Sequence, residues 1–208
     1  MMQATMTIDE RAAVRPGKVA PRDWLIRCDA VAAGYGKPVI GPVSFAAARG
    51  DVIGLAGANG SGKSTLLKAL IGTARIHAGR LDRQPRLQIS HQQQDFDTLE
   101  GFPLSGAELL ELTGAGSEGL PPWLADRLGE RLDRLSGGQV QLLRVWACLM
   151  APADLVLLDE PTNNLDREGT AFLAATLARH SADRAIIVVS HDAPFLQSVC
   201  TEVIELKP

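Results

Sequence analysis

The chain of 208 residues has few of the residues that mark specialised classes of protein. It has three cysteines, Cys28, Cys148 and Cys200, an odd number at wide spacing that fits neither a disulfide framework nor a zinc site. Its longest apolar runs, such as residues 155–158 and 185–189, have the length of strands, far short of the roughly 20 residues that cross a bilayer. We therefore expect reduced, mostly buried thiols in a chain that does not itself span a membrane.

A strong charge of either sign is also lacking, because the formal net charge is only -3 and lysines and arginines form no block. We therefore expect no nucleic acid as a partner. The first residues include Asp9, Glu10 and Arg11, where a signal peptide would need an apolar core. We interpret residues 1–22 as a disordered tail and residues 23–208 as one folded domain on the cytoplasmic side, since a hydrophobic content of 46% is enough for a core.

The N-terminal part of this domain is predicted to be rich in strands. Short β-prone segments cover residues 25–32, 43–48 and 51–56, and glycine and proline separate them. Residues 63–71 carry leucine and isoleucine at helical spacing, and Gly72 follows as a stop signal. A strand is therefore expected to lead into a helix through a glycine-rich loop.

The rest of the chain changes character twice. Residues 92–135 contain two candidate helices, 106–112 and 121–128, between glycines, prolines and acidic residues. Strands and helices then alternate, with helices at 138–150 and 167–180, strands at 155–159 and 185–190, and a short helix and a last strand at the end. The apolar strands lack a polar alternation, which is typical of parallel strands covered on both faces.

A glycine-rich segment at residues 57–64, Gly-Ala-Asn-Gly-Ser-Gly-Lys-Ser, fits the P-loop pattern G-x-x-x-x-G-K-[ST]. A predicted strand precedes it and a predicted helix follows, so backbone N–H groups and the helix N-terminus can converge on phosphates. Lys63 is then expected to reach the β- and γ-phosphates of ATP, and Ser64 to ligate Mg²⁺. The alternative is a glycine turn that only caps a buried helix, but such a turn does not require this lysine and hydroxyl.

Two carboxylates, Asp159 and Glu160, end the apolar run Leu-Val-Leu-Leu at residues 155–158. Ligands of open α/β sheets bind at this edge of the strands. Asp159 is a candidate Mg²⁺ ligand, and Glu160 a candidate general base that polarises water for attack on the γ-phosphate. Without a P-loop, a strand followed by a solvated turn would be the simpler interpretation.

A second candidate phosphate site is the segment Leu-Ser-Gly-Gly-Gln at residues 135–139, which leads directly into a predicted helix. Ser136 and the glycine amides would form a helix N-terminus that accepts an anion. Taken alone, the same residues are also explained as an ordinary N-cap and loop.

The order of these elements resembles the ATPase subunits of ATP-binding cassette (ABC) transporters, over nearly all of residues 24–208. The P-loop, the helical middle, the Leu-Ser-Gly-Gly-Gln signature, the Asp159-Glu160 strand and Ser190-His191-Asp192 follow one another as in that family. The resemblance implies an α/β fold class: a P-loop NTPase core with a parallel sheet, an N-terminal antiparallel β subdomain, and a small helical subdomain inserted at about residues 95–150.

The resemblance also assigns roles to single residues. Tyr35 is similar to the aromatic that stacks on adenine, and Gln94 to the glutamine that senses the γ-phosphate and Mg²⁺ and links the site to the membrane subunits. The register among Gln92, Gln93 and Gln94 is ambiguous, since Gln92 and Gln93 replace the family's usual apolar residue and proline. A solvated polar turn is the interpretation of the two glutamines other than Gln94.

The segment Pro-Thr-Asn-Asn-Leu-Asp at residues 161–166 resembles the loop through which paired subunits touch, with Asp166 contacting the opposite P-loop. A turn that caps the next helix is the competing interpretation, and both can hold. His191 resembles the histidine that reaches the γ-phosphate and orients the attacking water. The full set of candidate nucleotide-binding residues is Tyr35, Gly57, Asn59, Gly60, Ser61, Gly62, Lys63, Ser64, Thr65, Ser136, Gly137, Gly138, Gln139 and Asp166.

In this family the signature serine and glycines of one subunit complete the P-loop site of the other. One chain with one copy of each motif implies an ATP-dependent homodimer of two-fold symmetry. The implied partners are ATP with Mg²⁺, a second copy, and integral membrane permease subunits that hold the dimer at the inner face of the cell membrane. The implied catalytic set is Lys63, Gln94, Glu160 and His191, with Ser64, Gln94 and Asp159 as Mg²⁺ ligands.

The sequence gives the fewest indications about the transported substrate. Residues 94–105 and the compact length resemble ATPases of zinc and manganese uptake systems, with a departure at residues 99–101. A soluble ABC ATPase acting on ribosomes is the alternative, because such proteins share Asn-Asn-Leu-Asp at residues 163–166, although they usually hold two cassettes in one chain. A DNA-repair ATPase of ABC type would need a long coiled-coil insertion, for which residues 95–135 are too short.

Overall fold

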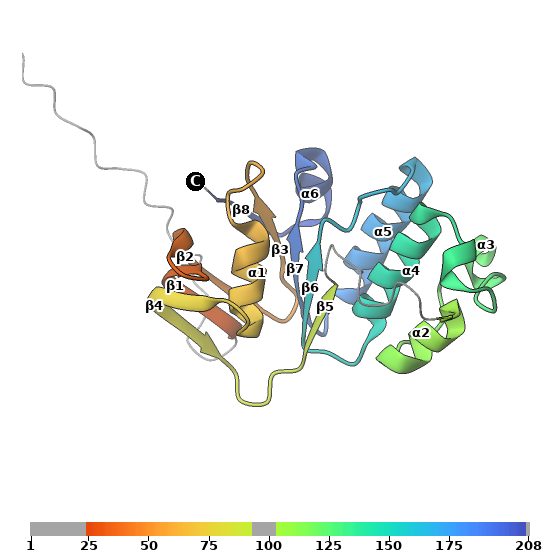
Figure 1. Ribbon diagram of the computed structural model, residues 1–208, viewed down its shortest axis with the longest axis horizontal. Coiled ribbons are helices and arrows are strands. Elements are labelled where there is room, and N and C mark those ends of the chain that lie inside the picture. Colours follow the sequence, from red (N-terminus) through yellow and green to blue (C-terminus); the bar gives the residue numbers. More distant parts are fainter. Residues whose placement is uncertain (1–23, 93–102, 207–208) are drawn as a thin grey trace, which may run out of the picture.

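The computed structural model describes residues 24–92 and 103–206, which form two β-sheets with helices around them (Figure 1). The predicted tail at residues 1–22, and with it Gln93 and Gln94, lie outside the described residues. Among the helices of the described segments, none has both the length and the apolar character of a membrane span.

The smaller sheet is antiparallel and has the strand order β2-β1-β4. It consists of β1 (Trp24–Gly34), β2 (Pro38–Ala48) and β4 (Arg75–Arg83). The sequence pattern did not predict β4, because four of its nine residues are charged and Gly79 interrupts it. Pairing with the central strand explains it: Cys28 of β1 lies opposite Phe45 of β2 on one side and Leu81 of β4 on the other.

The larger sheet is parallel and has the order β5-β6-β7-β3-β8. Its strands are β3 (Val52–Ala56), β5 (Ile89–Gln92), β6 (Leu155–Asp159), β7 (Ala185–Val189) and β8 (Glu202–Glu205). Every residue of β6 and β7 is buried, as their continuous apolar runs indicate. Parallel pairing brings the carboxyl ends of β3 and β6 to the same edge, so the P-loop and the acidic pair meet there. The α/β fold class with one parallel and one antiparallel sheet is confirmed.

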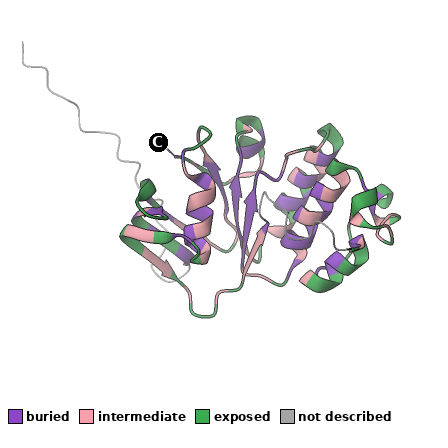
Figure 2. Cartoon of the chain, viewed as in Figure 1, coloured by how far each residue is buried: buried purple, intermediate pink, exposed green. Residues whose placement is uncertain are grey.

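Helices cover both faces of the parallel sheet (Figures 1 and 2). Helix α1 (Lys63–Ile71) lies between the two sheets, and its buried leucines share a core cluster with both. The opposite face packs against α4 (Gly137–Met150), α5 (Arg167–His180) and α6 (Ala193–Val199). Successive side chains of β6 point to opposite faces, so Leu157 joins the α1 cluster and Leu158 the other.

A third cluster lies at the helical end of the molecule, where α2 (Gly106–Thr113), α3 (Pro122–Ala125) and the 3₁₀ turn η1 (Leu132–Arg134) surround α4. Trp146 of α4 stacks on Phe172 with ring centroids 5.9 Å apart, and its Nε1–H donates to the Gly116 carbonyl at 2.8 Å. The cluster therefore combines buried residues of α2, α3 and α4, and Trp146 adds the contact with α5 through Phe172.

The predicted helix at residues 121–128 is too long, since α3 ends at Ala125. Two carbonyls of the following turn accept from the first residues of α2 instead of continuing a helix. The Gly106 N–H donates to the Glu130 carbonyl at 3.2 Å, and the Ala107 N–H to the Leu128 carbonyl at 2.8 Å. A tertiary contact with α2 thus replaces the local helical hydrogen bonds.

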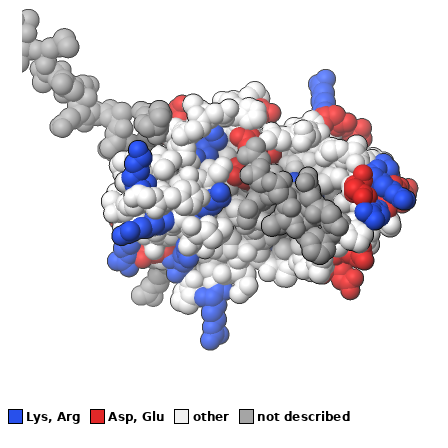
Figure 3. Space-filling view, viewed as in Figure 1, with Lys and Arg blue, Asp and Glu red and all other residues white. Residues whose placement is uncertain are grey.

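Charged side chains are unevenly placed over the surface. In the view of Figure 3, lysines and arginines gather over the antiparallel sheet, while acidic and basic side chains lie together at the helical end. Two arginines of the antiparallel sheet have acidic partners on it, Arg27 with Asp29 at 3.9 Å and Arg80 with Asp82 at 2.6 Å. These pairs offset part of the positive charge of that sheet.

Candidate nucleotide site

The P-loop connects the end of β3 to the start of α1, as predicted. Gly57, Gly60 and Gly62 have φ angles of 150°, 82° and 88°, values that side-chain-bearing residues rarely adopt. A Cβ on Gly62 would also lie 2.8 Å from the Cβ of Ile40. Gly62 is the N-cap of α1 and supplies no side-chain acceptor for the first amides of the helix. Those amides are therefore available to an anion.

Lys63 lies back over this loop, with only 7% of the residue exposed. Its Nζ donates to the carbonyl of Gly57 at 2.8 Å and to that of Ala58 at 3.1 Å. The ammonium group is thereby held beside the P-loop amides, where it adds a full positive charge to the partial charges of the helix end.

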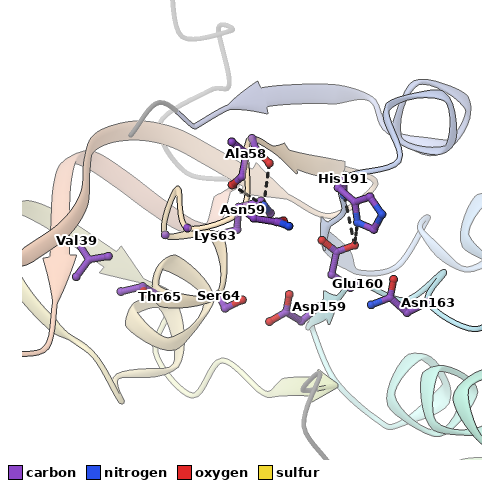
Figure 4. A pocket seen from close by; sticks show the side chains of 13 residues that line it. Val39, Ala58, Asn59, Lys63, Ser64, Thr65, Asp159, Glu160, Asn163 and His191 are labelled. Atoms are coloured by element: carbon purple, nitrogen blue, oxygen red, sulfur yellow. Dashed lines mark hydrogen bonds and ion pairs between the residues drawn. The ribbon is translucent and has the colours of Figure 1, made fainter.

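A cavity of about 800 Å³ lies at this edge of the parallel sheet, between the P-loop and the end of β6 (Figure 4). Most of the predicted P-loop and catalytic residues line it. They are Gly57, Asn59, Gly60, Gly62, Lys63, Ser64, Thr65, Asp159, Glu160 and His191, together with Val39, Ala58 and Asn163. Ser61 is buried below the loop, only 2% exposed, and is not among the lining residues.

Asp159 is 5% exposed, and its Oδ1 has no hydrogen-bond partner among the described residues. Burial raises the pKa of this carboxyl, and the negative charge of Glu160 adds to the rise; the Ser64 hydroxyl and Lys63 oppose it. In Figure 4 the carboxylate points toward Ser64. A buried, unpartnered carboxylate oxygen beside a serine hydroxyl suits a hard divalent cation such as Mg²⁺.

Glu160 follows in a left-handed backbone conformation, with φ of 51°. Its amide donates to the Val189 carbonyl of β7 at 2.8 Å. Its carboxylate Oε2 lies 2.8 Å from Nδ1 of His191 and accepts from the His191 backbone amide at 3.3 Å. The structure thus brings together Glu160 and His191, two predicted residues that are 31 positions apart.

The signature residues lie at a different cavity, of about 440 Å³. It is lined by Trp123, Ser136, Gly138, Gln139, Leu142, Asn164, Leu165, Asp166, Glu168 and Gly169. The predicted site residues are therefore divided between two cavities of one chain, and Gly137 lines neither of them. Asp166 caps α5, since its Oδ1 accepts from the Gly169 amide at 2.7 Å, so the capping interpretation is confirmed.

The start of α4 carries a capping box. Ser136 Oγ accepts from the Gln139 amide at 3.3 Å, and Gln139 Oε1 accepts from the Ser136 amide at 2.9 Å. Arg127 also donates to Gln139 Oε1, at 2.8 Å. The N-cap interpretation of Ser136 is confirmed.

Tyr35 is exposed in the turn between β1 and β2, and the Lys68 Nζ lies 6.0 Å from its ring centroid. It does not line the P-loop cavity. Gln94 lies outside the described residues, so its predicted role stays a prediction. The interpretation of Gln92 as part of a solvated turn is wrong: Gln92 ends β5 and is only 5% exposed.

Two residues near the acidic pair were not among the predicted site residues. Asn163 lines the P-loop cavity, and its place in the segment 161–166 was the available signal. Gln141 of α4 is 7% exposed and donates from Nε2 to the carbonyls of Glu160 at 3.3 Å and Pro161 at 3.2 Å. No local pattern pointed to Gln141, because its contacts lie 19 and 20 positions away.

A P-loop on a parallel sheet, with a carboxylate-histidine pair facing it, defines a P-loop ATPase. Residues 40–163 match the family described as ABC transporter. Two relatives are named zinc import ATP-binding protein ZnuC. That of Roseobacter denitrificans is 32% identical over 86% of this chain and 74% of its own length, and that of Cereibacter sphaeroides 34% identical over 80% and 72%. The chain belongs to the ABC transporter family, as an ATP-binding and ATP-hydrolysing subunit.

Solved structures show the same fold. An ATP-binding subunit of an ABC transporter superposes with a TM-score of 0.72 over 88% of this chain and 85% of its own, at 23% sequence identity. The arrangement of the two sheets is thus retained where most side chains differ.

Proposed function

We propose that this chain is the ATPase subunit of an importer of divalent metal ions, zinc above all, and that it works as an ATP-dependent homodimer bound to a membrane permease. One observation carries the ATPase part: the Glu160-His191 pair faces the P-loop across a cavity of about 800 Å³. The metal cargo is supported by relatives at 32% and 34% identity that are named zinc import proteins.

Within the cavity, the first amides of α1 and the ammonium group of Lys63 bind the phosphates of ATP. Ser64, Asp159 and Gln94 hold Mg²⁺, which neutralises phosphate charge when bound. Glu160 acts as the general base that accepts a proton from the attacking water. The imidazole of His191, held by the Glu160 carboxylate, is oriented toward the γ-phosphate, and the exposed ring of Tyr35 stacks on adenine.

Ser136, Gly137, Gly138 and Gln139 act on the nucleotide of a second copy. They line, or adjoin, a cavity separate from the P-loop cavity of their own chain. A head-to-tail pair with two-fold symmetry brings each signature segment to the partner's P-loop, with Asp166 at the contact. ATP then stabilises the closed pair, and hydrolysis removes the contacts of the γ-phosphate with both chains.

Coupling to transport requires membrane permease subunits, which place the chain at the inner face of the cell membrane. Among the alternatives, a ribosome-bound ATPase is not favoured, because the relatives described above are named zinc import proteins. The deciding measurement is zinc uptake in cells that lack this chain. Uptake should be restored by the wild-type chain and not by Glu160→Gln. Normal uptake without the chain, together with its copurification with ribosomes, would overturn the importer proposal.

The catalytic part has its own test. Glu160→Gln should bind ATP with unchanged affinity, lose steady-state hydrolysis, and form a dimer in saturating ATP and Mg²⁺ that light scattering detects. Turnover equal to that of the wild type would remove Glu160 from the role of base. A variant that stays monomeric would contradict the ATP-dependent pair.

A further inference from the structure

The acidic pair Asp159 and Glu160 lies at the end of β6, where the backbone depends on hydrogen bonds from neighbouring elements. Glu160 has φ of 51°, a conformation that is costly for a residue with a side chain and persists only where its surroundings impose it. Glu160 and its predecessor Asp159 are 7% and 5% exposed, so their backbone groups need partners inside the protein. The amide of Glu160 finds one in β7, through the Val189 carbonyl.

The backbone carbonyls of Glu160 and Pro161 accept hydrogen bonds from a side chain of α4. Gln141 Nε2 donates to the Glu160 carbonyl at 3.3 Å and to the Pro161 carbonyl at 3.2 Å. Because the side chain is buried, this amide fixes two successive peptide units just after the strand. Gln141 lies in α4, whose N-cap is Ser136, so one helix contacts both peptide units and carries the signature segment at its start.

The backbone amide of Asp159 donates a hydrogen bond to a side chain of β5. The ladder between β5 and β6 ends with Gln92 opposite Leu158, one residue before Asp159. The Gln92 side chain extends the ladder by one step, because its Oε1 accepts from the Asp159 amide at 3.2 Å. An apolar residue at position 92 could not do this.

We infer that Gln92 and Gln141 are positioning residues for ATP hydrolysis: their two buried side-chain amides, one from β5 and one from α4, hold the backbone of residues 159–161 and so fix the direction of the Glu160 carboxylate. Neither glutamine lines the P-loop cavity, so both act through the backbone of the acid pair and not on the nucleotide. This inference rests on the proposed role of Glu160 as the base.

The test replaces each amide by an apolar side chain of similar length, in Gln141→Met and Gln92→Met. In either variant we expect kcat for ATP hydrolysis to fall by about 10- to 100-fold, the scale of a misplacement of about 1 Å in a catalytic group. KM and the affinity for ATP should change by less than about threefold, because no contact with ATP is removed. The matched control is Gln88→Met, since Gln88 is an exposed amide that donates to the Arg86 carbonyl and should keep the wild-type kcat.

A double-mutant cycle with Glu160→Gln separates positioning from general weakening. If the glutamines act through Glu160, adding Gln141→Met or Gln92→Met to Glu160→Gln should lower the residual single-turnover rate no further. An additional loss equal to that in the wild-type background would overturn the inference, and so would an unchanged kcat in the single variants. A loss of ATP affinity that parallels the loss of kcat would assign the amides a structural role and overturn it as well.

If Gln141→Met does not fold, Gln92→Met decides by the same measurements. A failure of the proposed role of Glu160 as the base can be told apart from a failure of this inference. In that case the Glu160→Gln variant alone would keep the full turnover of the wild type.

Discussion

The N-termini of α1 and α4 are both glycine-rich helix ends that were predicted to bind phosphate, yet they differ in what their own side chains do. Helix α1 begins at Gly62 with no side-chain cap. Helix α4 begins with a complete capping box between Ser136 and Gln139. The first end leaves its amides to an outside anion, while the second satisfies two of its amides within the chain.

The difference teaches that similar motifs can be preformed to different degrees. The end of α1 lies in a cavity together with Lys63, Asp159 and Glu160, so one chain holds a nearly complete phosphate site. The described residues that line the cavity at the end of α4 include no lysine, and the capping box already satisfies the amides of Ser136 and Gln139. On the proposed function, the first end binds ATP in the single chain, and the second only when a partner presents it.

The largest effect is expected from Lys63→Ala, which should weaken ATP binding by a single chain about 100-fold, since hydrogen bonds of a charged group contribute up to about 3 kcal/mol. Titration with a fluorescent ATP analogue, at concentrations where the chain is monomeric, measures this. Ser136→Ala should leave the same affinity unchanged. Equal losses in the two variants would break the distinction between the two helix ends.

A smaller effect is expected from Gly138→Ala. The added Cβ would lie 2.7 Å from the Asn164 carbonyl oxygen, so α4 or the loop that carries Asn164 must shift. We expect the free energy of unfolding to fall by about 1–3 kcal/mol, the usual cost of overpacking, as measured by urea denaturation.

Gly137→Ala is the matched control for that measurement, since a Cβ there meets nothing within 4 Å. Its stability should stay the same or rise, because alanine favours a helix over glycine. If Gly138→Ala is equally stable, the close approach of α4 to residue 164 does not constrain the helix.

The smallest effect is expected from Ser136→Ala on stability. Loss of the N-cap should lower the free energy of unfolding by about 1 kcal/mol. The corresponding change at the start of α1, Gly62→Ala, removes no side-chain cap. It would destabilise the fold for other reasons, namely the φ of 88° and the close contact of the new Cβ with Ile40. Thermal unfolding of Ser136→Ala without nucleotide tests this, and an unchanged melting temperature would show that the capping box contributes nothing to stability.

The features that the sequence predicted well are local ones. Helix α1 spans residues 63–71 as predicted and ends at Gly72, whose φ of 88° only glycine adopts easily. The buried strands β6 and β7 followed from continuous apolar runs. In each case the signal and the structure lie within the same ten residues, so no knowledge of the rest of the chain was needed.

The features that escaped prediction depend on distant partners. Strand β4 carries charges and a glycine and exists because β1 pairs with it. The contacts of Gln141 and Gln92 with the acid pair join helices and strands that only the folded chain brings together. The resemblance to a family placed Glu160 and His191 at one site, but the 2.8 Å contact between their side chains needed coordinates.

Helix α4 belongs to two hydrophobic cores at once. Val145, Cys148 and Leu149 pack with the parallel sheet, and Leu142, Leu143 and Trp146 with the helical cluster. A rotation of α2 and α3 as a body must therefore either open one of these cores or carry the helix along. Because Gln141 of the same helix donates to the carbonyls of Glu160 and Pro161, a displacement of α4 would reach the backbone of the proposed base from the helical end of the molecule.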